Sequence, residues 1–179
     1  MMTSKHLGFL RELNQMHFKS WLDRNASKVL SEIGVEIGQR VLDFGCGSGT
    51  YSLASAKLVG VKGRVYSMDV SQDELGKVLD KARKQKIRNI STVLSNGNLL
   101  PFDQDSFDHV FLIDVLQEIT DKEKIFEEAK RVLKKGGLVT VYPMHLDINE
   151  VSRIATGSGL ELKERKYQLR ILVFSKSEK

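Results

Sequence analysis

The apolar residues of this chain follow more than one spacing. From residue 3 to about Gly34 they recur at helical spacing, with one interruption at residues 23–25. This part of the sequence predicts two helices, and Gly34 is well placed to end the second one. Farther along, short apolar runs are separated by longer segments with helical spacing, such as residues 72–86 and 121–133. The pattern predicts strands and helices in alternation.

The predicted strands are short and differ in their surroundings. Residues 110–113 form a continuous apolar run, which is typical of a strand buried on both faces. Residues 160–167 and 169–175 are expected to be two strands joined by a tight connection. Further strands are predicted at residues 41–44, 63–70 and 90–94 and after the glycine pair at 136–137, and further helices at residues 50–58, 72–86, 121–133 and 149–159.

The first strand leads into a loop with a glycine at every second position. Gly45, Gly47 and Gly49 remove three Cβ atoms from one short turn, so that a bound molecule can approach the backbone closely. Helical spacing in the residues that follow places this loop at the N-terminus of a helix, with free N–H groups facing outward. The loop is therefore expected to bind a ligand.

The spacing of these glycines departs from two common phosphate-binding loops. A dinucleotide fingerprint reads GxGxxG, whereas here the third glycine comes one residue early and Thr50 takes the expected place. A P-loop needs a Lys-Ser/Thr pair after its last glycine, and this chain has Thr50-Tyr51 instead. Asp43, which precedes the glycines, suits a ligand that carries a positive group.

A second acidic residue ends the next predicted strand. Asp69 lies about 20 residues beyond the glycine loop, the offset at which α/β nucleotide folds place an acid on the ribose hydroxyls. An ionised carboxylate only accepts hydrogen bonds, so it suits a vicinal diol. The alternative is that Asp69 caps the following helix, a role for which Ser71 and Asp73 are better placed.

Three separated segments resemble one known family, the class I S-adenosylmethionine-dependent methyltransferases. The run Asp-Phe-Gly-Cys-Gly-Ser-Gly at residues 43–49 looks like the family's first motif, and residues 100–110 and 131–137 are similar to later segments. The matches cover roughly residues 35–141 and point to the methyltransferase type 11 or UbiE-like small methyltransferases. The resemblance implies an α/β fold, a Rossmann-like three-layer α/β/α sandwich. Its mostly parallel seven-stranded sheet would have the order 3-2-1-4-5-7-6 and a terminal antiparallel strand.

The resemblance also implies S-adenosylmethionine as the cofactor and S-adenosylhomocysteine as its product. The glycines would approach the methionine part, Asp43 would orient it, Asp69 would hold the ribose, and Asn96 with Gly97 would border adenine. Asn96 stands where relatives commonly carry an aspartate, so its contact would lack charge assistance, and ordinary turn chemistry is the alternative for it. Cys46 is expected to be a packing residue rather than a nucleophile. The implied cofactor-binding residues are Asp43, Gly45, Cys46, Gly47, Gly49, Asp69, Val70, Asn96, Gly97 and Asp114.

The catalytic residues stay open, because transfer from an activated sulfonium mainly requires alignment. Asp114, Gln117 and Glu118 should face the pocket, since ligands of an open parallel sheet lie outside the carboxyl ends of its strands. Many small-molecule relatives carry a histidine at the place of Glu118, so the family's role does not transfer to it. His145 is placed for proton removal, although a His and an Asp two residues apart are more often ordinary loop residues. The candidates are His145, Asp114 and Glu118.

The length of 179 residues predicts a single globular domain. Residues 1–34 are expected to form helices that cap the cofactor pocket, and residues 35–179 the methyltransferase domain. Trp21 is expected to pack against the sheet, and the alternative for the N-terminal segment is a flexible lid. The connections after the fourth and fifth strands are short, so the pocket should be open apart from the N-terminal helices or a partner chain.

Composition removes several classes of protein. Cys46 is the single cysteine, which excludes an internal disulfide and a thiolate metal cluster, and no metal is expected. No apolar run approaches the roughly 18 residues of a membrane span and no secretory signal is visible, so a cytoplasmic location is the default expectation. The net charge of +5 is compatible with an anionic partner such as RNA, but the basic residues are spread along the chain.

The function expected from these features is methyl transfer to a small-molecule acceptor. The alternatives are a non-catalytic S-adenosylmethionine-binding module and an RNA methyltransferase subunit completed by a partner. A nicotinamide-dependent dehydrogenase is opposed by the glycine spacing and by the two terminal strands. The sequence leaves open the acceptor, the methylated atom and the oligomeric state, for which a homodimer is one option.

Overall fold

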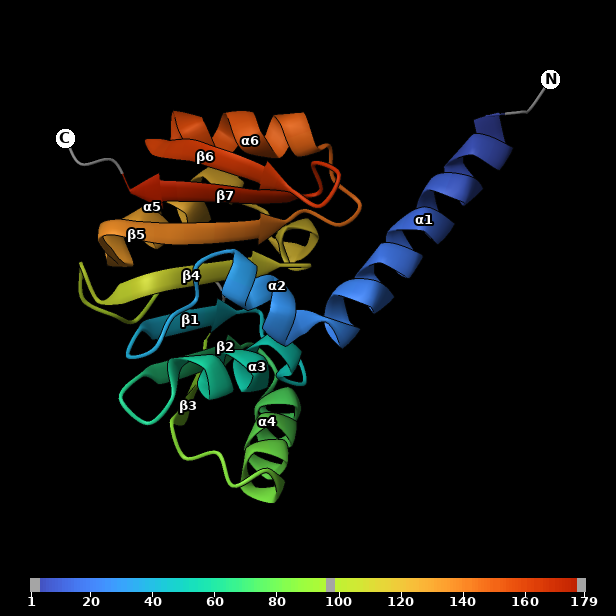
Figure 1. Ribbon diagram of the computed structural model, residues 1–179. Coiled ribbons are helices and arrows are strands. Elements are labelled where there is room, and N and C mark those ends of the chain that lie inside the picture. Colours follow the sequence, from blue (N-terminus) through green and yellow to red (C-terminus); the bar gives the residue numbers. More distant parts are fainter. Residues whose placement is uncertain (1–3, 96–98, 177–179) are drawn as a thin grey trace.

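The described residues form one mixed sheet of seven strands (Figure 1). The computed structural model describes residues 4–95 and 99–176, with side chains from residue 12 onward. Strands β1 to β5 are parallel, and β7 runs antiparallel between β5 and β6. The order β3-β2-β1-β4-β5-β7-β6 confirms the predicted topology. The strands are β1 (Arg40–Phe44), β2 (Arg64–Asp69), β3 (Ile90–Leu94), β4 (Phe107–Ile113), β5 (Leu133–Tyr142), β6 (Leu160–Lys166) and β7 (Ile171–Lys176).

Helices cover both faces of this sheet and complete the predicted three-layer sandwich. The helices are α1 (Ser4–Arg24), α2 (Ala26–Glu32), α3 (Thr50–Val59), α4 (Gln72–Lys84), α5 (Lys122–Val132) and α6 (Ile148–Gly157), with a 3-10 turn, η1, at Leu116–Glu118. In Figure 1, α2, α3 and α4 lie in front of the sheet and α5 lies behind it. Within the described part of the chain, no helix has the length and apolar character needed to cross a membrane.

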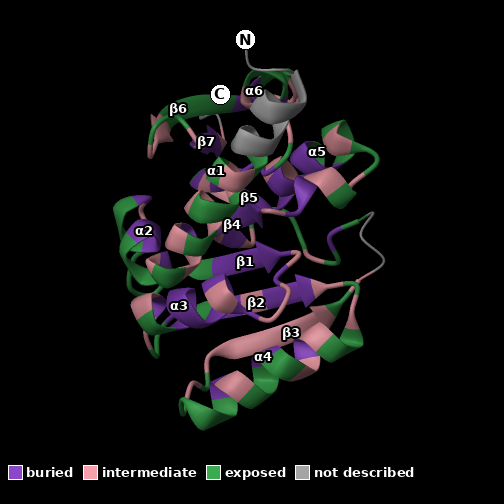
Figure 2. Ribbon diagram, turned by 90° about the vertical axis from the view of Figure 1, so that its right-hand side faces the viewer, coloured by how far each residue is buried: buried purple, intermediate pink, exposed green. Residues whose placement is uncertain are grey.

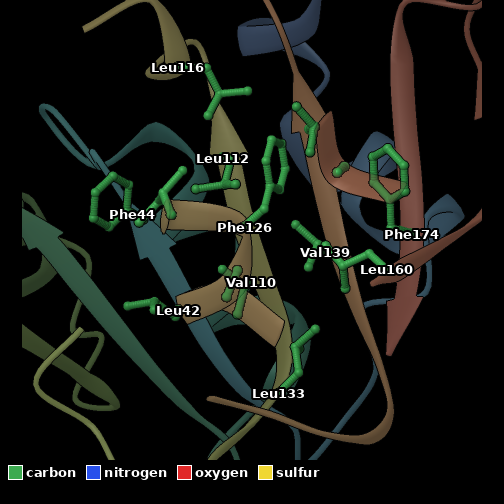
Figure 3. Packing of buried hydrophobic residues seen from close by; sticks show 14 of the residues in the cluster. Leu42, Phe44, Val110, Leu112, Leu116, Phe126, Leu133, Val139, Leu160 and Phe174 are labelled. Atoms are coloured by element: carbon green, nitrogen blue, oxygen red, sulfur yellow. The ribbon is translucent and has the colours of Figure 1, made fainter. Parts of the chain in front are cut away.

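Alternate residues of the central strands pack into opposite helix layers. Val41 belongs to the core shared with α2 and α3, whereas its neighbour Leu42 belongs to the core shared with α5 and α6. Figure 3 shows the second core, in which Phe126 of α5 lies over Val110 and Leu112 of β4. The edge strand β3 is only half-buried (Figure 2). The central strands β1 and β4 are therefore almost wholly buried between the two helix layers.

The two N-terminal helices are separated by Asn25, whose side-chain amide donates to the carbonyl of Trp21 at 2.8 Å. Figure 1 shows α1 leaving the body of the protein at an angle, while α2 lies on the sheet. The C-terminal turns of α1 make the contacts: Leu22 is fully buried, and Trp21 stacks on Phe18 and packs against Tyr167. Trp21 also packs against the core that contains Ile171 and Val173 of β7, which confirms its predicted packing against the sheet. Closure of the N-terminal helices over a bound cofactor stays a prediction.

The sheet differs from the sequence-based prediction at β4 and β5. β4 begins at Phe107 rather than at residue 110, because Asp108 accepts hydrogen bonds from the Arg40 N–H and Lys134, and buried His109 bonds Thr140 at 2.8 Å. Because Asp108 and His109 are polar, the apolar pattern of the sequence does not reveal the start of the strand. β5 starts directly after α5, and the expected glycine turn is a bulge inside it, since the pairing with β4 jumps from Leu133 to Leu138.

Candidate functional site

The glycine loop joins β1 to α3 at the carboxyl edge of the sheet. Gly45, Gly47 and Gly49 all have positive φ angles, of 68°, 47° and 87°. A Cβ on Gly45 would lie 2.3 Å from Cγ2 of Val115, and one on Gly49 would lie 2.8 Å from Cγ2 of Val78. A Cβ on Gly47 would meet nothing within 4 Å. Two of the glycines thus permit close packing, and Gly47 is the one that faces open space.

Two adjoining hollows lie along this edge. The smaller has a volume of about 200 Å³ and the larger about 410 Å³, and they share Gly45, Asp69, Val115 and Glu118. The smaller hollow is completed by Phe44, Met68, Val70, Ser95, Ile119 and Thr120. The larger is completed by Lys19, Asp23, Cys46, Gly47, Ser48, Thr50, Tyr51, Glu74, Ile113 and Asp114. Together they form a groove that runs from the end of β2 across β1 to the end of β4.

Asp69 lies where the two hollows meet. One oxygen of its carboxylate accepts from the Gly47 N–H at 2.8 Å, and the other accepts from the Ser71 N–H at 2.9 Å. Each oxygen retains a lone pair for a further donor. Ser71, rather than Asp69, is the N-cap of α4 and accepts from the Glu74 N–H. The structure therefore leaves Asp69 available to a ligand in the groove.

Asp43 lies beneath the loop and lines neither hollow. Its side chain is 1% exposed and accepts a hydrogen bond of 2.6 Å from Ser52, whose hydroxyl in turn accepts from Ser67. Burial raises the pKa of Asp43 to about 6, against the lowering effect of the Ser52 hydrogen bonds. The carboxylate faces Ser52 rather than the groove, and its predicted role in orienting the methionine part stays a prediction. The geometry supports a role in holding the loop.

The other predicted cofactor-binding residues differ in their burial and in their distance from the groove. Cys46 is buried against Leu75 and Val78, and burial raises the pKa of its thiol, as expected for a packing residue. Val70 is 65% exposed and lines the smaller hollow. Asn96 and Gly97 lie outside the described residues, so their predicted border with adenine stays a prediction.

The candidate catalytic residues separate into two places. Asp114 has a positive φ of 57° and accepts a hydrogen bond from Gln117 at 3.1 Å. Burial raises its pKa, while Lys19 opposes the shift. Asp114 and Glu118 line the larger hollow together. His145 is exposed and lines neither hollow, although it is close enough to lower the pKa of Asp114.

Among the residues of the larger hollow that were not predicted from the sequence, three form a polar cluster between α1 and α3. Lys19 of α1 bonds both carboxylate oxygens of Asp23 at 2.8 Å and lies 3.7 Å from Asp114. Tyr51 donates to Asp23 at 2.6 Å, and the Lys19 ammonium lies 5.6 Å from the centre of its ring. Lys19 and Asp23 are one helical turn apart, which is a visible signal, but only tertiary packing brings them to the glycine loop.

The larger hollow has an acidic lining. Among its described lining residues, Asp23, Asp69, Glu74, Asp114 and Glu118 are acidic, and Lys19 is the one cation. Such a lining favours a ligand with positive charge. In the part of the chain that the structure describes, no group of three His, Cys, Asp or Glu residues is arranged to hold a metal.

The sheet order, the terminal antiparallel strands and the groove at the glycine loop define a Rossmann-like methyltransferase fold. The crystal structure of a SAM-dependent methyltransferase from Aquifex aeolicus is similar, with a TM-score of 0.77 and 26% identity over 87% of this chain and 91% of that one. A family profile described as a methyltransferase domain matches residues 36–164. The chain belongs to this methyltransferase domain family.

Two curated proteins are similar to this chain in sequence. The demethylmenaquinone methyltransferase of Shouchella clausii (strain KSM-K16) is 34% identical over 125 residues, which cover 70% of this chain and 51% of the relative. The ubiquinone/menaquinone biosynthesis C-methyltransferase UbiE of Vibrio vulnificus (strain YJ016) is 38% identical over 109 residues, which cover 60% of this chain and 42% of the relative. The chain thus spans about half the length of the curated relatives that it matches.

Proposed function

We propose that the protein transfers a methyl group from S-adenosylmethionine to a small-molecule acceptor. The observation that carries this proposal is the pair of hollows joined at Asp69, beside a glycine loop in which Gly47 faces open space. Membership of the methyltransferase domain family supports the reaction class. The names of the two curated relatives, both quinone methyltransferases, support a small-molecule acceptor.

The residues present fit the cofactor. The smaller hollow offers an apolar wall at Met68, Val70 and Ile119, which suits a nucleobase, and Ser95 leads into the predicted adenine border at Asn96 and Gly97. Asp69, between the hollows, has free lone pairs for the two ribose hydroxyls. The methionine part would then occupy the acidic larger hollow, whose charge complements an ammonium and a sulfonium.

The methionine carboxylate needs a partner in this acidic lining, because an unpaired buried charge is costly. The glycine loop offers few donors. The N–H groups of Gly45 and Cys46 donate to the Met68 carbonyl, the Gly47 N–H donates to Asp69, and the Gly49 N–H donates within the loop. Lys19 is the cation in the described lining, so we assign the carboxylate to its ammonium. Binding would take Lys19 from Asp23 and Asp114 and draw the end of α1 toward the loop.

The cofactor supplies a methyl group on positively charged sulfur, so the protein mainly aligns the acceptor. When bound, with its ribose on Asp69 and its carboxylate on Lys19, the cofactor would give up the methyl group to the acceptor's electron pair and keep the electrons of the carbon–sulfur bond on sulfur. Asp114 and Glu118 favour binding of the cationic cofactor by their charge, and exposed Glu118 can take a proton from the acceptor and pass it to solvent. Catalytic roles for Asp114 and Glu118 are part of this proposal, and a role for His145 stays a prediction.

Calorimetric titration of the full chain tests the proposed function. S-adenosylmethionine and S-adenosylhomocysteine should bind, and NAD should not. Failure of both adenosyl ligands to bind would refute the proposal. Binding without methyl transfer to any acceptor, tested with a methyl-labelled donor, would instead favour a cofactor-binding module completed by a partner.

A further inference from the structure

A third hollow, with a volume of about 270 Å³, continues the same edge of the sheet beyond the larger hollow. Its floor is the loop after β5, from Tyr142 to Ile148. One side is formed by Asn14 and Gln15 of α1, and the other by the turn between β6 and β7, residues 168–170. In Figure 1 this is the side on which α1 leaves the body, where the arrows of β4 and β5 end.

The third hollow is separated from the larger hollow by a thin wall. On the floor, the Asp114 N–H donates to the Tyr142 carbonyl at 3.0 Å, and these residues line the larger and the third hollow respectively. Above the floor, the rings of Phe18 and Tyr142 are 5.4 Å apart, and Lys19 reaches Asp114. Consecutive residues of α1 thus stand between the two spaces, and a shift of α1 would join them.

The lining combines an apolar wall with one cation and one carboxylate, Asp147, which caps α6 by accepting from the Asn149 and Glu150 N–H groups. Tyr142 and Met144 are buried and supply the wall together with Pro143, Leu146 and Ile148. Arg170 is the one cation among the described lining residues. Its guanidinium lies 4.7 Å from the centre of the Phe18 ring and donates to the carbonyl and side-chain oxygens of Asn14 at 3.2 and 3.0 Å. These bonds use two of its five N–H donors, so others remain for an anionic group.

The turn beside Arg170 has an unusual backbone. Tyr167, Gln168 and Leu169 are consecutive non-glycine residues with positive φ angles, of 51°, 56° and 66°. Left-handed backbone at non-glycine residues is strained, and strain of this kind gathers at ligand clamps. The turn holds Leu169 58% exposed at the rim of the hollow. An exposed apolar side chain next to a fixed guanidinium suits a flat apolar ligand with an acidic group.

We propose that this third hollow binds the methyl acceptor, and that the acceptor is an apolar ring system carrying a carboxylate or a similar anionic group. The proposal rests on the proposed methyl transfer. The order along the edge would then be adenosine, methionine and acceptor, with the reacting atom directed past Phe18 toward Asp114. The volume lies just below the usual range of ligand pockets, about 300–1,000 Å³, which fits a small ring system.

The test uses 2-naphthoate, a flat apolar carboxylate that lacks a nucleophilic hydroxyl, and its neutral analogue 2-naphthylmethanol. Calorimetry on the full chain saturated with S-adenosylhomocysteine should show 2-naphthoate binding. The Arg170→Met variant should lose about tenfold in affinity for 2-naphthoate and keep its affinity for the alcohol. Leu169→Asp, a change at an exposed position, should also lower the affinity for 2-naphthoate. Arg153→Met, on the exposed surface of α6, should leave the affinities for both ligands unchanged.

Binding of S-adenosylhomocysteine by each variant shows whether the donor site is intact. If the wild-type chain does not bind it, the proposed function fails. If the wild-type chain binds S-adenosylhomocysteine but not 2-naphthoate, the third hollow is not an anion-selective acceptor site. The same conclusion follows if Arg170→Met and Leu169→Asp bind 2-naphthoate as tightly as the wild-type chain. A nuclear Overhauser effect between the ¹³C-labelled methyl group of S-adenosylmethionine and the naphthoate ring is expected in the ternary complex, and its absence despite binding would refute the acceptor role.

Discussion

The ammonium of Lys19 on α1 lies 3.7 Å from the carboxylate of Asp114, the residue that follows β4. This contact joins the N-terminal helix to the carboxyl edge of the sheet, next to the glycine loop. In the proposed complex, Lys19 turns to the methionine carboxylate. Helix α1 is then both a wall of the donor site and its link to the third hollow.

Replacing Lys19 with methionine should lower the affinity for S-adenosylhomocysteine about tenfold to a hundredfold, because a charge-assisted hydrogen bond is lost. The affinity for 5′-methylthioadenosine, which lacks the amino-acid part, should not change. Calorimetry with both ligands measures the difference. Lys28→Met on α2, where the side chain is exposed and pairs only at 4.0 Å with Glu32, is the matched control. Equal losses for both ligands would show a structural effect of Lys19 rather than a carboxylate contact.

The glycines of the loop should differ in what they contribute. Gly45→Ala should destabilise the fold by about 2–4 kcal/mol, because the new methyl group collides with Val115 at a positive φ. The methyl group of Gly47→Ala meets no protein atom, so this change should cost about 1–2 kcal/mol of stability through backbone strain alone. It should nevertheless strongly lower the affinity for S-adenosylhomocysteine. Urea unfolding and calorimetry separate these effects.

Gly38→Ala is the control for the strain in the glycine loop. Gly38 also has a positive φ, of 87°, and open space around it, but it lies in the turn before β1. Its alanine variant should lose similar stability and bind the ligand normally. Normal ligand binding by Gly47→Ala would count against a close approach at the loop.

The sequence could predict most of the fold because the central strands are apolar and the glycine loop is local. It could not predict the start of β4, since Asp108 and His109 are polar and find their partners only in neighbouring strands. For the same reason it missed Lys19 and Tyr51, which meet through the packing of α1 on α3. The buried position of Asp43 likewise depends on the Ser52 and Ser67 hydroxyls, which come from different elements.

Arg131 of α5 should anchor the connection between β3 and β4. Its guanidinium donates to the carbonyls of Phe102 and Leu100 at 2.7 and 2.9 Å, and Glu128 accepts from both Arg131 and the Leu100 N–H. Arg131→Met should cost about 2–4 kcal/mol at neutral pH, because it leaves the buried Glu128 carboxylate without its cation, with only the Leu100 N–H as a donor. Urea unfolding measures this loss, and Arg153→Met, at an exposed position, should cost little.

The loss from Arg131→Met should shrink in acid. The Arg131 hydrogen bonds lower the pKa of Glu128, so the stability from this pair is present above the carboxyl's ordinary range and fades as the pH falls through the lowered pKa. A pH-independent loss would mean that the carbonyl contacts, rather than the ion pair, carry the effect.

Replacing Asp43 with asparagine should change how stability depends on pH. The wild-type carboxyl has its pKa raised to about 6, so between roughly pH 4 and 6 the folded chain holds a proton that the unfolded chain releases. Wild-type stability from this group therefore falls as the pH rises to 6 and is constant above. The amide does not titrate. The stability of Asp43→Asn relative to wild type should increase by about 1–3 kcal/mol from pH 4 to pH 8, whatever constant the changed hydrogen bonds add.

His109 should change the stability of the fold with pH in the direction opposite to Asp43. Burial lowers its pKa to about 3, so its contribution is complete above the ordinary imidazole pKa of 6.5 and is lost as the pH falls. In the wild-type chain the two groups oppose each other between pH 4 and 6, and Asp43→Asn should uncover the acid lability due to His109. Urea unfolding at several pH values gives the profiles. Parallel profiles for the two proteins would show that the Asp43 carboxyl keeps an ordinary pKa, and that its place under the glycine loop costs the fold little.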